Sequence, residues 1–178
     1  MAVRKGDILT VRMTKKIQKL LGIKNLASSV NTEQPSFLDE WYMNYFNINK
    51  NWFYIFMETA TFYTVVKPLE QIHGSQAFIE YFQRMLIDVI NKESNKYELK
   101  QFLINEMHLR NTENKASIRI IIDMVYHAEI KKYKKGDYEI FDDLNEIPQA
   151  LMGYKSPRVA FRENIKKIFE NNEYLSLN

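Results

Sequence analysis

Residues 51–66 read NWFYIFMETATFYTVV, and this stretch decides which fold class the sequence can adopt. Aromatic and β-branched side chains, which favour strands, continue until one acidic residue, Glu58, which is followed by Thr59. We therefore expect two strands, at 52–57 and 61–66, with Glu58 and Thr59 in the turn between them. A carboxylate in such a turn can accept the free backbone N–H groups, and a threonine hydroxyl can do the same.

A third strand is expected just before this stretch, at residues 42–48. Asn49, Lys50 and Asn51 supply the connecting turn, because asparagine tolerates a positive φ better than most residues. The side chains on both faces of these strands are apolar. We expect helices against one face of the sheet and a loop or a partner against the other.

Hydrophobic spacing predicts the remaining elements. Apolar and polar side chains alternate over 8–13, which indicates a strand, and Thr14 and Gly22 are suited to cap a short helix between them. Residues 27–37 have loop composition. Further helices are predicted at 75–91, 96–104, 115–133, 142–146 and 158–170, and a further strand at 106–110. The sequence thus predicts a single α+β domain over residues 1–178, with an antiparallel sheet of about four or five strands and helices packed mainly on one face.

Composition excludes several classes of protein. The chain has 178 residues, of which 46% are hydrophobic, and no cysteine, so it has no disulfide and no thiolate metal site. No segment contains the roughly 18 consecutive apolar residues of a membrane span. The basic first residues lack the apolar run of a secretory signal. We expect a cytoplasmic protein with no membrane association.

Positive charge is concentrated at the amino-terminal end. Residues 1–24 contain seven Lys or Arg and one Asp, although the net charge of the chain is only +3. Basic patches bind nucleic acid by neutralising phosphates, and nearby aromatic rings can stack on bases. The candidates for such a patch are Arg12, Lys15, Lys16 and Lys19. The alternative is a solvated basic face, with the aromatic residues in the core or at a protein interface.

One pair of residues has the spacing of a metal or acid–base site. Asp123 and His127 are four residues apart in the predicted helix 115–133, so their side chains share a face. A metal ion would need a further ligand, such as Glu58. The alternative is that Asp123 bonds a neighbouring loop and that His127 is partly exposed. We assign no catalytic residue, no metal ligand and no cofactor.

Four blocks of sequence carry a resemblance to a known family. They are TKKIQKLLG at 14–22, WYMN with the following ETATFYTV at 41–65, the segment from Asn114 to Asp123 with His127, and LNEIP with GYKSP at 144–157. The ordered set resembles a small uncharacterised bacterial family, a domain of unknown function found in chromosomes and mobile elements. The resemblance implies a single α+β domain in which shared polar residues meet at one cleft. These residues are Trp41, Asn44, Glu58, Thr59, Asn114, Asp123 and His127.

The sequence leaves two functions open. The first hypothesis is a non-enzymatic binding or regulatory protein of a mobile-element, defence or toxin–antitoxin setting, acting through a protein or nucleic-acid partner. The second is a small metal-dependent hydrolase or nuclease that uses Glu58, Asp123 and His127. The sequence does not indicate the oligomeric state.

Overall fold

The structure, a computed structural model, describes residues 2–3, 8–24, 26, 36–94, 102–103, 106–112, 115–135 and 138–170. The strands are β1 (Ala2–Val3), β2 (Ile8–Met13), β3 (Glu40–Ile48), β4 (Asn51–Glu58), β5 (Thr64–Pro68), β6 (Phe102–Leu103) and β7 (Glu106–Asn111). The helices are α1 (Lys15–Leu21), α2 (Ser75–Ser94), α3 (Lys115–Lys135) and α4 (Pro157–Glu170), with the 3₁₀ helices η1 (Tyr138–Glu146) and η2 (Ala150–Met152).

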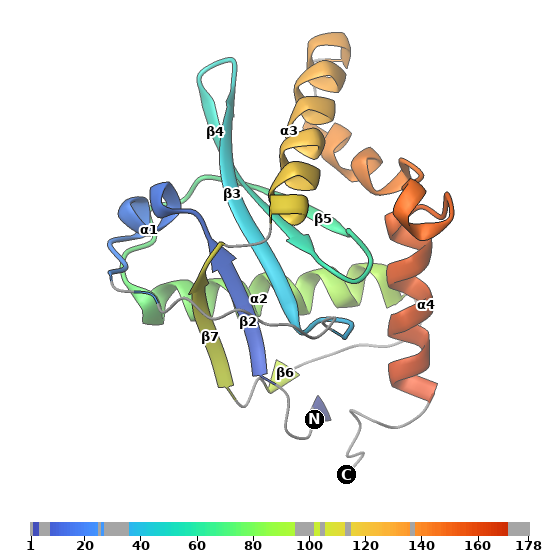
Figure 1. Ribbon diagram of the computed structural model, residues 1–178, viewed down its shortest axis with the longest axis horizontal. Coiled ribbons are helices and arrows are strands. Elements are labelled where there is room, and N and C mark those ends of the chain that lie inside the picture. Colours follow the sequence, from blue (N-terminus) through green and yellow to red (C-terminus); the bar gives the residue numbers. More distant parts are fainter. Residues whose placement is uncertain are drawn as a thin grey trace.

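Five strands form the main sheet, in the order β5-β4-β3-β2-β7 (Figure 1). Strands β3, β4 and β5 form the antiparallel meander that the sequence predicts. Strand β2 instead runs parallel to both β3 and β7. The α+β class and the number of strands are confirmed, but the sheet is mixed and not antiparallel throughout. The physical reason is that the chain passes from β2 to β3 through α1, and such a crossover connection allows two strands to run in the same direction.

Both turns of the meander lie where the sequence predicts them. Asn49 and Lys50 have φ values of 48° and 68°, which are the positive values that a two-residue hairpin turn requires. The second turn is longer than expected, because β5 begins at Thr64 and not at residue 61. The residues between β4 and β5 are held by the side chain of Glu58, as described below.

The strands divide their side chains between two hydrophobic cores. Tyr54 and Phe56 of β4 face the larger core, which α1, α2 and α4 close, and α2 crosses the strands behind the sheet in Figure 1. Phe53, Ile55 and Met57 face the smaller core, which α3 and η1 close. These five side chains are at most 2% exposed. Helices therefore cover both faces and do not pack mainly on one, because β4 is apolar on both sides and each side must be shielded from water.

The helix predictions are largely confirmed. Thr14 caps α1 by accepting a hydrogen bond from the Ile17 N–H at 3.4 Å, and Gly22 ends the helix in the left-handed conformation. Residues 27–35 of the expected loop, and 96–101 and 104 of the expected short helix, lie outside the described residues. Residues 102–103 of that predicted helix form β6, which pairs with β1.

A side chain of η1 covers part of the open edge of β5. The Thr64 N–H donates to Asn145 Oδ1 at 2.7 Å, and Asn145 Nδ2 donates to the Thr64 carbonyl oxygen at 2.8 Å. The Asn145 amide thus occupies the place that a neighbouring strand would take at Thr64. Because Asn145 is 1% exposed, both bonds are shielded from water.

We expect Asn145→Asp to lower the free energy of unfolding by about 1–3 kcal/mol. The variant keeps an acceptor for the Thr64 N–H but places a second oxygen against the Thr64 carbonyl. Chemical denaturation measures the change. Asn51→Asp, at the exposed first residue of β4, is the control and should change stability by no more than about 0.5 kcal/mol. Equal stability of the two variants would contradict the role of the Asn145 amide.

Candidate functional site

Glu58 is the last residue of β4, and its carboxylate is fully buried. One oxygen, Oε1, accepts hydrogen bonds from the N–H groups of Leu38 and Ala60, both at 3.1 Å. The other, Oε2, accepts from the Thr61 N–H at 2.7 Å and from the Thr61 hydroxyl at 2.5 Å. The interpretation of Glu58 as a turn residue is confirmed. The carboxylate ties the turn to the segment that enters β3.

Acid–base chemistry at Glu58 would require a raised pKa and a second titrating group. Burial raises the pKa of the Glu58 carboxyl, and hydrogen bonds from Thr61, Ala60 and Leu38 oppose the rise. These donors are backbone N–H groups and one hydroxyl, none of which titrates near neutral pH. The side chain is also closed to solvent. The arrangement therefore suits a structural acid.

Of the other residues of the expected polar cleft, Trp41 and Thr59 are neighbours of Glu58, whereas Asn44, Asp123 and His127 lie elsewhere. Trp41 lies opposite Glu58 in the sheet and is fully buried, and the Thr59 hydroxyl donates to the Glu40 carbonyl oxygen at 3.2 Å and does not accept from the turn. Asn44 is opposite Ile55, which faces the smaller core, and its Oδ1 accepts from the Tyr45 N–H at 2.9 Å.

Asp123 and His127 are exposed on α3, which packs over the smaller core. Tyr54 and Phe56, which are four and two residues before Glu58, face the larger core. By the alternation of a strand, Glu58 therefore points to the opposite side of the sheet from α3. Asn114 lies outside the described residues. Within the described part of the chain, no group of three His, Asp or Glu side chains is placed to hold a metal ion.

Glu58→Ala is expected to lower the free energy of unfolding by about 2 kcal/mol or more, because it leaves buried N–H groups of the turn without an acceptor. Denaturant unfolding measures this. Glu70→Ala removes an exposed carboxylate near the other end of β5 and should change stability by no more than about 0.5 kcal/mol. A Glu58→Ala variant as stable as the wild type would contradict the structural role.

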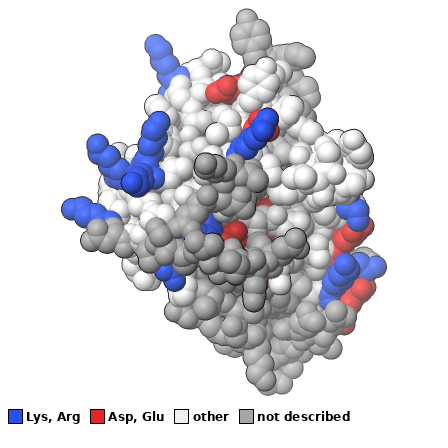
Figure 2. Space-filling view, viewed as in Figure 1, with Lys and Arg blue, Asp and Glu red and all other residues white. Residues whose placement is uncertain are grey.

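The expected nucleic-acid patch loses one of its members in the structure. Arg12 is 3% exposed and forms a buried ion pair with Glu40. Lys15, Lys16 and Lys19 are exposed on α1. Figure 2 shows Lys and Arg side chains gathered on the side of the molecule where α1 lies, with no acidic side chain among them. Of the four expected patch residues, the three lysines of α1 are therefore the ones that face solvent.

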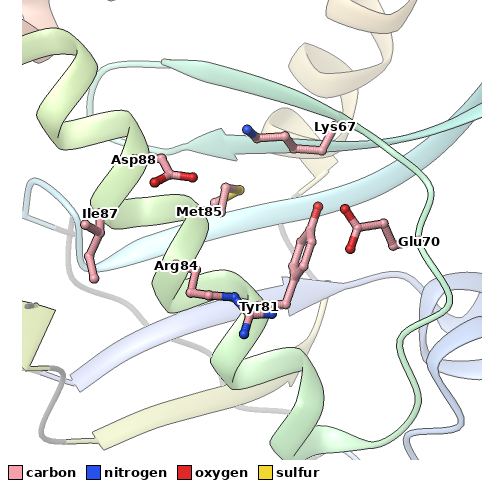
Figure 3. A pocket seen from close by; sticks show the side chains of 7 residues that line it. All are labelled: Lys67, Glu70, Tyr81, Arg84, Met85, Ile87 and Asp88. Atoms are coloured by element: carbon pink, nitrogen blue, oxygen red, sulfur yellow. The ribbon is translucent and has the colours of Figure 1, made fainter.

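A groove that the sequence does not reveal lies between β5 and α2. Its main part has a volume of about 320 Å³, and a smaller part of about 100 Å³ adjoins it and shares Lys67 and Asp88. The smaller part passes along Thr64–Val66 and ends at Lys92 of α2 and Asp142 of η1. We call this the β5–α2 groove, and its main part is lined by Lys67, Glu70, Tyr81, Arg84, Met85 and Asp88 (Figure 3).

Charges of both signs line the β5–α2 groove along its whole length. The main part contains the cations Lys67 and Arg84 and the anions Glu70 and Asp88. At the far end, Lys92 Nζ lies 2.5 Å from Asp142 Oδ2. Cations and anions are equal in number among these residues, so the lining is close to electrically neutral.

Tyr81 is the feature of the groove that points most directly to a ligand. The side chain is 8% exposed, and its hydroxyl has no hydrogen-bond partner among the described residues. In Figure 3 the hydroxyl points away from α2, toward Glu70 and β5. Burial raises the pKa of Tyr81, with a smaller contribution from Glu70, so the hydroxyl stays protonated. It is a donor and acceptor that the described part of the chain leaves unused.

Two other buried tyrosines have partners for their hydroxyls. The Tyr54 hydroxyl donates to the Glu70 carbonyl oxygen at 2.9 Å, and the Tyr63 hydroxyl donates to Glu93 Oε1 at 2.7 Å. Trp41 Nε1 also lacks a partner among the described residues, but Trp41 is enclosed in the larger core and does not line the groove. Tyr81 therefore differs from them in being both unsatisfied and part of the groove wall.

We expect Tyr81→Phe to leave the free energy of unfolding unchanged or to raise it by up to about 1 kcal/mol, because it removes a buried hydroxyl that has no partner. Tyr63→Phe is the matched control and should cost about 1–3 kcal/mol, because it removes a buried hydrogen bond to Glu93. Thermal and denaturant unfolding of the two variants give the comparison. An equally large loss in both would show that the Tyr81 hydroxyl is already satisfied.

The fold and the groove define a small α+β domain with a concave surface between β5 and α2. The chain belongs to the family described as Domain of unknown function (DUF6933), whose model matches residues 10–160. This finding confirms the resemblance to a domain of unknown function. No curated protein matches the chain. Among the described residues, no helix has the length and apolar character needed to cross a membrane.

Proposed function

We propose that the protein is a non-enzymatic binding protein that acts through a protein partner, and that the β5–α2 groove is its binding site. The buried Tyr81 hydroxyl carries this proposal, because an unpaired polar group is costly to bury and a ligand in the groove would satisfy it. A groove of about 320 Å³ is large enough to take one or two side chains of a partner.

The charge of the groove favours a protein over a nucleic acid. Nucleic acids bind to surfaces where cations outnumber anions, because affinity comes from neutralising phosphates. Glu70 and Asp88 would repel a phosphate chain as strongly as Lys67 and Arg84 attract it. A peptide, which carries alternating N–H donors and C=O acceptors, fits a lining of mixed sign.

The hydrolase or nuclease alternative has weaker support. It would use Glu58, Asp123 and His127, but Glu58 is enclosed with four hydrogen-bond donors on its oxygens, and the other two are exposed on α3. The lysines of α1 keep nucleic-acid binding as the competing function. A cytoplasmic location, which the lack of cysteine favours, and a mobile-element, defence or toxin–antitoxin setting stay predictions.

Panning random phage-displayed peptides on the immobilised full chain tests the proposal. We expect a family of enriched peptides whose affinity falls by about tenfold or more in Arg84→Glu or Asp88→Lys, both at exposed positions in the groove. The triple variant Lys15→Glu, Lys16→Glu, Lys19→Glu is the matched control and should bind these peptides as the wild type does. Fluorescence anisotropy with synthetic copies of the peptides gives the affinities.

Two outcomes would contradict the proposal. The first is no enrichment of any peptide family over an empty surface. The second is enriched peptides that bind the groove variants unchanged. Salt-sensitive retention on heparin that the triple lysine variant loses, with no peptide enrichment, would assign the function to the lysine face of α1.

A further inference from the structure

Strand β5 is an edge strand of the main sheet, and its hydrogen-bonding pattern shows which backbone groups point away from β4. The Glu58 N–H donates to the Tyr63 carbonyl oxygen, and the Leu69 N–H donates to the Trp52 carbonyl oxygen, both at 2.9 Å. In an antiparallel pair, bonded positions alternate along the strand. Because residues 63 and 69 are bonded to β4, so are 65 and 67, and the backbone groups of 64, 66 and 68 point to the open edge.

The fold closes most of this open edge and leaves a short gap. Asn145 binds both backbone groups of Thr64, and Pro68 has no N–H to offer. Val66 is left with an N–H and a C=O that point outward and that have no partner in the described part of the chain. Val66 also lines the smaller part of the β5–α2 groove, so its outward edge adjoins the site proposed above.

We propose that the protein binds an extended segment of its partner, which adds to the sheet as a strand beside β5 and exchanges two backbone hydrogen bonds with Val66. This inference rests on the proposed function and specifies how the groove recognises its partner. Addition of a strand to an exposed edge is a common mode of peptide recognition, in which backbone bonds give affinity and pockets for alternate side chains give specificity.

The dimensions of the groove fit such a segment. From Tyr81 to Lys92 the axis of α2 rises about 16 Å, at 1.5 Å per residue. An extended chain rises about 3.3 Å per residue, so the groove accommodates about five residues. Of the outward-pointing residues Thr64, Val66 and Pro68, Val66 is the one that offers both an N–H and a C=O, because Asn145 binds Thr64 and Pro68 has no N–H. The site therefore selects a short extended segment and resists the long edge-to-edge pairing that leads to aggregation.

The side chain that enters the main part of the groove meets Tyr81, Arg84 and Glu70 together. A charged side chain would be repelled there by the group of its own sign. An amide, which has a donor and an acceptor, can pair with groups of both signs and with the Tyr81 hydroxyl. The segment should therefore carry asparagine or glutamine at the position that faces α2.

The experiment uses the peptide most enriched by panning, together with copies of it that are N-methylated at one backbone position each. Methylation at the residue that pairs with Val66 should weaken binding to the wild-type protein by about tenfold or more, and methylation at the next residue should have a much smaller effect. Hydrogen exchange followed by NMR should show that the Val66 amide becomes protected when the peptide is bound. Replacing the asparagine or glutamine of the peptide with glutamate or lysine should weaken binding in both cases.

A proline variant of the protein tests the hydrogen bond that the Val66 N–H donates to the peptide. Val66→Pro removes an N–H that the sheet does not use, so the variant should fold and lose peptide affinity by about tenfold or more. Val65→Pro removes an N–H that pairs with β4 and should unfold the edge of the sheet. If Val66→Pro does not fold, the N-methyl series on the wild-type protein still decides the question.

The results separate this inference from the proposed function. Peptides that bind in the groove with no sensitivity to N-methylation and no protection of Val66 would overturn strand addition and leave the binding function intact. Pairing of β5 with a second copy of this chain, seen as a dimer whose formation protects Val66, would also overturn it. If no peptide binds at all, both proposals fail.

Discussion

Strand β4 buries side chains on both of its faces, and the rest of the structure depends on this constraint. A strand with one apolar face can leave its other face in water. Strand β4 has apolar side chains on both faces, Tyr54 and Phe56 on one and Phe53 and Ile55 on the other, and all of them must be shielded from water. Each such side chain contributes about 1.5–3 kcal/mol when it is buried. Two layers of helices provide this shielding: α1, α2 and α4 close the larger core, and α3 with η1 closes the smaller one.

Elements that local chemistry determines could be predicted from the sequence. Thr14 and Gly22 cap α1, and the turn at Asn49 and Lys50 needs only the positive φ that these positions adopt. The direction of β2 could not be predicted, because it depends on where the crossover through α1 returns to the sheet. Both parallel and antiparallel pairing would have satisfied the same alternation of apolar and polar residues in 8–13.

Polar residues that are conspicuous in the sequence proved to be structural. Glu58 stands alone in an apolar stretch, and its carboxylate satisfies three backbone N–H groups and one hydroxyl. Arg12 belongs to a basic segment, yet it is buried against Glu40, which is 28 residues away in sequence. Removal of either partner of such a pair would leave an uncompensated buried charge. A charged residue within an apolar stretch is one for which the fold must supply hydrogen bonds or an ion pair. Its position in such a stretch does not by itself indicate a reactive group.

The residues that line the β5–α2 groove, by contrast, do not stand out in the sequence. Arg84, Asp88 and Lys92 recur every four residues on α2, which is the pattern of an ordinary solvated helix face. Only the placement of α2 beside an edge strand turns that face into one wall of a groove, and this placement is set by packing in the larger core.

The fold satisfies some of its polar groups several times over and leaves others without a partner, and this difference supports a binding role. Glu93 is 2% exposed and is bonded by Tyr63 and Arg162 as well as paired with Arg158, so a buried charge in this protein is compensated several times over. At the groove, the Tyr81 hydroxyl and the outward backbone groups of Val66 have no partner among the described residues. The same fold uses the Asn145 side chain to satisfy Thr64, two residues from Val66. The edge of β5 is closed at Thr64 and open at Val66, beside a buried hydroxyl that has no partner. A partner that supplies the missing bonds would account for both features, because an unpaired buried hydroxyl reduces the stability of the free protein.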